Sequence, residues 1–107
     1  MNYIYIVRHK TVYPDDKTKD SMQISEWAFF SKEGAEYHCI KHITGFLVGK
    51  DRLEKDDPRI GILEDFKNQL KLSDDDYRSY AIPCNWTKDG ERLVDDLIEV
   101  EKLIVRP

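Results

Sequence analysis

A change from strand-forming to helix-forming residues at Phe30-Ser31 is the feature that most constrains how this chain can fold. Before it, Trp27 and Phe29 belong to a short run that is rich in β-formers. After it, residues 32–36 begin a helical pattern, and Ser31 is placed to cap that helix. The chain therefore contains a strand that is followed directly by a helix.

The rest of the pattern predicts a single α+β domain over residues 1–107. The expected fold is an antiparallel sheet of three to four strands with two or three helices packed on one face. The C-terminal segment 88–105 fits either helix or strand. We favour a short helix over about 88–97 followed by a strand through Val105. Further strands are expected over 3–9, 23–30 and 77–84, and further helices over 32–48 and from Pro58 to about Leu70.

Two of these elements also carry predictions about burial. The strand over 3–9 is an unbroken apolar run, which is typical of a strand covered on both faces. In the helix over 32–48, the spacing places Phe46 on the core side and Leu47 at the flank. The other residues expected on the core side are Ala35, Cys39 and Ile43.

The pattern of charged residues favours another protein as the binding partner. The net charge is −4, and the acids occur in clusters that a basic protein surface could contact. The alternative is that they cap turns and helices. Nucleic acid is disfavoured, since the aromatic and basic residues of the first loop region (Arg8, Lys10, Tyr13, Lys17 and Lys19) are offset by Asp15, Asp16 and Asp20. A nucleic-acid-binding accessory protein is the third functional hypothesis. The candidate contact residues are Asp74, Asp75, Asp76, Asp95, Asp96 and Glu99.

The start of the chain and the cysteines predict a cytoplasmic location. The N-terminus lacks the basic start and cleavage site of a signal peptide, and no apolar run reaches the ~20 residues that span a membrane. Cys39 and Cys84 are therefore expected to be free thiols. The open edges of a small antiparallel sheet leave room for a homodimer.

Residues 5–13, with Arg8 and His9, resemble the start of the histidine phosphatase family, in which a strand ends in Arg-His-Gly. The resemblance implies Arg8 as a phosphate ligand and His9 as the nucleophile. Lys10 occupies the position of the glycine, and its side chain would obstruct close approach of a substrate to the backbone. We therefore reject this assignment.

His38 and His42 are four residues apart, so they lie on one face of a helix at a spacing that can bind zinc. Cys39 stands where a zinc protease motif has its acid. Two amphipathic residues beside a buried stripe are the alternative interpretation. No cofactor-binding motif is present. A small metal- or phosphate-dependent enzyme that uses His9, His38 and His42 is therefore the second functional hypothesis.

Residues 30–36, followed by a tyrosine-rich strand that contains Tyr77 and Tyr80, are similar to small proteins of phages and bacterial mobile elements. In those proteins Phe-Ser/Thr leads into a helix with an Ala-Glu pair. The resemblance implies a small acidic protein that binds and blocks another protein, as immunity and counter-defence proteins do. Our leading prediction is a non-enzymatic protein-binding module, an inhibitor without a cofactor.

Overall fold

The computed structural model describes residues 2–13, 22–72, 74–86 and 92–106 of the chain. The elements follow one another as two strands, two helices and two strands. Their bounds are β1 (Asn2–Val12), β2 (Met22–Phe29), α1 (Lys32–Leu47), α2 (Pro58–Leu72), β3 (Tyr77–Trp86) and β4 (Arg92–Val105).

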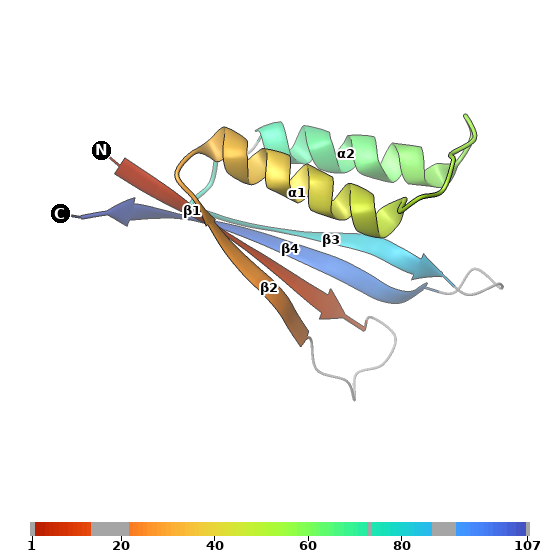
Figure 1. Cartoon of the computed structure of the whole chain (residues 1–107), viewed down its shortest axis with the longest axis horizontal. Helices are drawn as coiled ribbons and strands as arrows, with labels where there is room; N and C mark the ends of the chain where they lie inside the picture. The colour runs from red at the N-terminus through yellow and green to blue at the C-terminus, as the bar shows by residue number, and fades with distance from the viewer. Residues whose placement is uncertain (1, 14–21, 73, 87–91, 107) are drawn as a thin grey trace.

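The four strands form one antiparallel sheet in the order β2-β1-β4-β3. Both helices lie on the same side of this sheet (Figure 1). The predicted α+β class, with an antiparallel sheet and helices on one face, is confirmed. The core lies between the layers, where Val7 of β1 is flanked by Trp27 of β2 and Val100 of β4.

Alternation along β1 shows that only one face of the sheet is covered. Tyr5, Val7 and His9 are buried under the helices, whereas Ile6 and Arg8 point to the other face and are half-buried. No helix of the described ranges lies over that second face. The expectation that β1 is covered on both faces is therefore wrong, because an antiparallel sheet can leave one face to solvent.

α1 begins as the sequence predicts. The Ser31 hydroxyl oxygen accepts a hydrogen bond from the backbone N–H of Gly34 at 3.0 Å. The buried stripe is Ala35, Cys39, Ile43 and Leu47, a regular spacing of four residues. The assignment of Phe46 and Leu47 is corrected accordingly: Leu47 packs in the core, and Phe46 is half exposed.

α2 begins after Asp57, whose carboxylate accepts a hydrogen bond from the backbone N–H of Arg59 at 2.9 Å. Phe66 and Leu70 are its buried residues. The Phe66 ring meets the Tyr80 ring edge-on, with 5.4 Å between their centroids. This contact fixes α2 against β3.

The tail is strand, so the predicted helix over about 88–97 is wrong from Arg92 onward; residues 88–91 lie outside the described ranges. β4 pairs with β1 from Asn2↔Val105 to Val12↔Asp95 and with β3 on its other side, and this ladder holds the segment in the extended conformation. β3 also continues past Pro83 to Trp86. An edge strand tolerates this proline because one side of its backbone has no strand neighbour within the described ranges.

Candidate functional site

The six acids predicted to contact a partner do not form one surface. Asp74, Asp75 and Asp76 are exposed in the connection between α2 and β3. Asp95, Asp96 and Glu99 belong to the central strand β4 and are only 5%, 3% and 7% exposed. The prediction is therefore corrected for these last three residues, because so little of their surface is accessible to a partner.

Asp96 and Glu99 have side-chain partners on β1. The Asp96 carboxylate lies 2.8 Å from Nε2 of His9, and the Glu99 carboxylate accepts from the Lys10 ammonium group at 2.8 Å. Arg8 bridges Glu26 and Glu101 at 2.7 and 2.8 Å, and these hydrogen bonds raise the pKa of the guanidinium. The basic patch expected from Arg8 and Lys10 is thus engaged with glutamates, while Lys17 and Lys19 lie outside the described residues.

The acids that stay exposed lie at a corner with two exposed apolar residues, Leu72 at the end of α2 and Tyr77 at the start of β3. Leu72 is 87% exposed and Tyr77 is 53% exposed. We call Leu72, Asp74, Asp75, Asp76 and Tyr77 the acidic corner. Exposed apolar and acidic side chains therefore follow one another within a short stretch of the chain at this corner.

A groove runs from the acidic corner along the outer edge of β3. It consists of two adjoining cavities of about 630 and 270 Å³ that share Gln69, Ser79 and Tyr80. One wall is α2, and the other is β3. The α2 residues that line it are Ile62, Asp65, Phe66, Gln69 and Leu72, and the β3 residues run from Tyr77 to Pro83.

The charged side chains that line this groove are mostly acidic. Asp65, Asp74 and Asp75 line it, and Asp65 accepts a hydrogen bond from the Gln69 amide at 2.9 Å. Arg78 is the basic residue of the lining, but it is buried and donates to the Leu70 carbonyl at 2.7 Å. The groove therefore presents carboxylates to solvent.

The three histidines of the chain lie together where α1 packs over β1 and β2. The His9 and His42 rings meet edge-on with 4.3 Å between centroids, and the His42 and His38 rings stack at 5.8 Å. Trp27 and Phe46 pack around them. We call His9, His38 and His42 the histidine cluster.

Burial keeps part of the histidine cluster uncharged at neutral pH. Desolvation lowers the pKa of His42 to about 4, and the neighbouring His9 and His38 add to this effect. Burial, and then Lys41, lower the pKa of His38. Neutral imidazoles among aromatic rings are suited to packing between α1 and the sheet.

Among the described residues, the histidine cluster forms neither a three-ligand metal site nor a catalytic triad. No three His, Cys, Asp or Glu residues in the described part of the chain are placed to hold a metal ion. Ser25 lies opposite His9 in the β1–β2 register, but Nδ1 of His9 has no hydrogen-bond partner among the described residues, so no Ser-His-Asp triad forms. Arg8 and His9 point to opposite faces of β1, which separates the two groups of the phosphatase-like motif.

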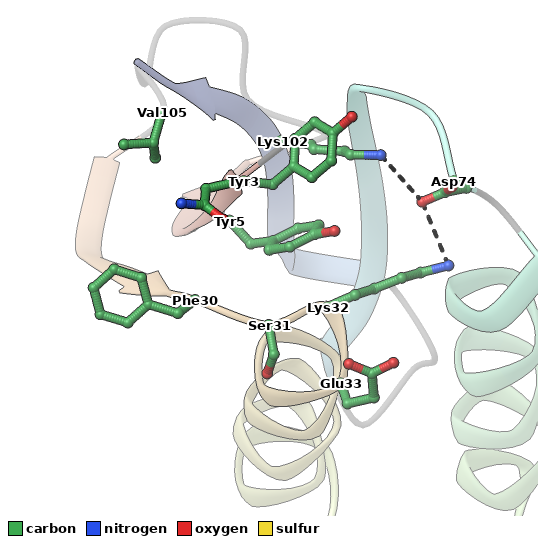
Figure 2. Close-up of a pocket in the computed structure, with 10 residues that line it drawn as sticks. Tyr3, Tyr5, Phe30, Ser31, Lys32, Glu33, Asp74, Lys102 and Val105 are labelled. Carbon is green, nitrogen blue, oxygen red and sulfur yellow. Dashed lines mark ion pairs between the residues drawn. The ribbon is translucent and has the colours of Figure 1, made fainter. Parts of the chain in front are cut away.

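Figure 2 shows a further cavity, of about 730 Å³, where β1 and β4 project past the start of α1. Tyr3 and Tyr5 line it, and Lys32 and Lys102 point toward Asp74 at 3.5 and 3.9 Å. The two carboxylates that line it, those of Glu33 and Asp74, equal the two ammonium groups in number. The cavity thus offers no excess of positive charge for an anion.

The groove and the exposed Leu72 were missed by the sequence reasoning. Leu72 lies outside the apolar face of α2 formed by Ile62, Phe66 and Leu70. Its position away from that face was the feature of the sequence that could have predicted an exposed leucine. That β3 lies at the sheet edge follows from strand order, which no local pattern encodes.

Comparison of the chain with protein-family models, with curated proteins and with solved structures found no match. No helix within the described residues is long and apolar enough to cross a membrane.

Proposed function

We propose that this protein is a non-enzymatic protein-binding module that takes a basic segment of a partner protein at the acidic corner and thereby inhibits that partner. The observation that carries the proposal is the exposure of Leu72 and Tyr77 on either side of Asp74, Asp75 and Asp76. Apolar and acidic groups at one corner can both attract a basic surface and hold it.

The two kinds of residue make different contributions. Complete burial of a leucine side chain contributes about 2 kcal/mol, and tyrosine is among the residues that most often dominate a protein interface. The carboxylates steer a basic partner toward the corner, and screening by salt weakens this steering. The resemblance to small proteins of phages and mobile elements supports an inhibitor that acts inside the cytoplasm of a host cell.

The proposal is tested by affinity capture from a host-cell lysate followed by a binding measurement with the captured protein. The test variant is Asp75→Lys/Asp76→Lys, and the control is Glu54→Lys/Asp56→Lys, which makes the same change of charge in the exposed connection between the helices. We expect the wild-type and control proteins to bind the partner alike, and the test variant to bind at least about tenfold more weakly.

The association rate should also fall by about tenfold or more between about 0.05 and 0.5 M salt. Equal binding by the two double variants, together with a rate that does not respond to salt, would contradict the proposal.

A further inference from the structure

β3 has an open backbone edge. It lies at the end of the sheet and pairs with β4 alone, so no strand of the described residues faces its outer side. From Tyr77 to Ile82 the strand contains no proline, so every residue has a backbone N–H group that can donate a hydrogen bond. Pro83 lacks this group and ends the stretch. Half of the backbone groups of such an edge point away from the sheet and can pair with another chain.

α2 runs beside this open edge and supplies the second wall of a channel. Ile62, Asp65, Gln69 and Leu72 recur at intervals of three to four residues, so they form one stripe along the helix. The two cavities between this stripe and β3 adjoin each other and share Gln69, Ser79 and Tyr80 as lining residues. An edge strand with a helix alongside is a geometry that binds extended peptides by strand addition.

We propose that an extended basic segment of the partner adds to the outer edge of β3 as a fifth strand, in the groove beside α2. This inference rests on the proposed function and names the way in which the partner binds. Six residues, from Tyr77 to Ile82, give a ladder of about 20 Å.

The residues that line the groove indicate which side chains the added strand should carry. Successive side chains of a strand point to opposite sides, so alternate residues of the segment enter the groove. Asp65 and Asp75 favour lysine or arginine, while Ile62, Leu72 and Tyr80 provide apolar contacts for the stems of those side chains or for a neighbouring aliphatic residue. A basic segment that alternates with aliphatic residues fits this surface.

The test uses the whole chain and a synthetic peptide of about eight residues that alternates lysine with valine. Two further peptides carry N-methyl groups on alternate backbone amides, one on the lysines and one on the valines. An added strand directs only one of these two sets of amides at β3, so one methylated peptide should bind at least about tenfold more weakly while the other binds like the parent. Amide hydrogen exchange over Tyr77–Ile82 should slow when the parent peptide is bound.

The variant Asp65→Lys/Asp75→Lys should weaken binding of the parent peptide at least about tenfold, and Glu54→Lys/Asp56→Lys should leave it unchanged. Strand addition is overturned if both methylated peptides bind like the parent, or if the exchange of the β3 amides is unaltered. If the peptide does not bind and capture of the partner still depends on Asp75 and Asp76, strand addition fails and the proposed function stands.

Discussion

Acid should destabilise this protein through His42, a residue of α1 whose ring lies against His9 of β1 and His38. The pKa of His42 is about 4 in the folded chain, because desolvation disfavours its charged form, against about 6.5 for an unfolded chain. Between these two values the unfolded state binds more protons, so stability is complete above about pH 6.5 and is lost as the pH falls toward 4.

The magnitude follows from the same pair of pKa values. Their difference of about 2.5 corresponds to about 3.4 kcal/mol at 1.36 kcal/mol per unit. His42 is only half-buried, so solvent screening reduces this to about 2 kcal/mol. The lowered pKa of His38 acts in the same direction.

The assay is urea unfolding of the wild-type protein and of His42→Phe at several pH values between about 7.5 and 4.5. Phenylalanine keeps a ring against His9 and Phe46 but cannot take up a proton. We expect the free energy of unfolding of the wild type to fall by about 2 kcal/mol more than that of the variant over this range. Parallel pH profiles for the two proteins would refute the reasoning.

Three further predictions concern α1. The pKa of the buried Cys39 thiol is raised to about 12, mainly by desolvation. The thiol should therefore stay unmodified by iodoacetamide at about pH 8 until the chain is unfolded. Peptide mass spectrometry measures the extent of modification. Ser31→Ala should lower the free energy of unfolding by about 1 kcal/mol, because the cap bond to Gly34 is lost; urea titration checks this. Ile43→Ala should lower the same quantity by about 2 to 5 kcal/mol, since Ile43 is fully buried, and Tyr37→Ala on the exposed face serves as the control.

Local signals predicted the parts of the fold that depend on nearby residues. Ser31 before a helical pattern and Asp57-Pro58 before another are capping sequences, and both helices begin there. The tail was assigned wrongly because Leu93, Leu97, Val100 and Ile104 follow helical spacing by chance, while pairing with β1, about 90 residues away in the chain, decides the conformation.

The candidate site was predicted only in part, for the same physical reason. Asp74, Asp75 and Asp76 lie in a connection, so their exposure follows from local sequence. Asp96 and Glu99 look equally polar in the sequence, but they face His9 and Lys10 across the sheet, and such pairs exist only after the strands have come together. The gathering of His9 with His38 and His42 likewise depends on the packing of α1 over β1.

The most direct test of the central claim is an NMR titration of the isotope-labelled protein with its captured partner. The account predicts that the largest amide shift changes fall on the acidic corner and the adjoining groove, from Gln69 to Tyr80, and that they disappear in the Asp75→Lys/Asp76→Lys variant. Changes confined to the histidine cluster or to the face of the sheet that carries Arg8 would contradict it.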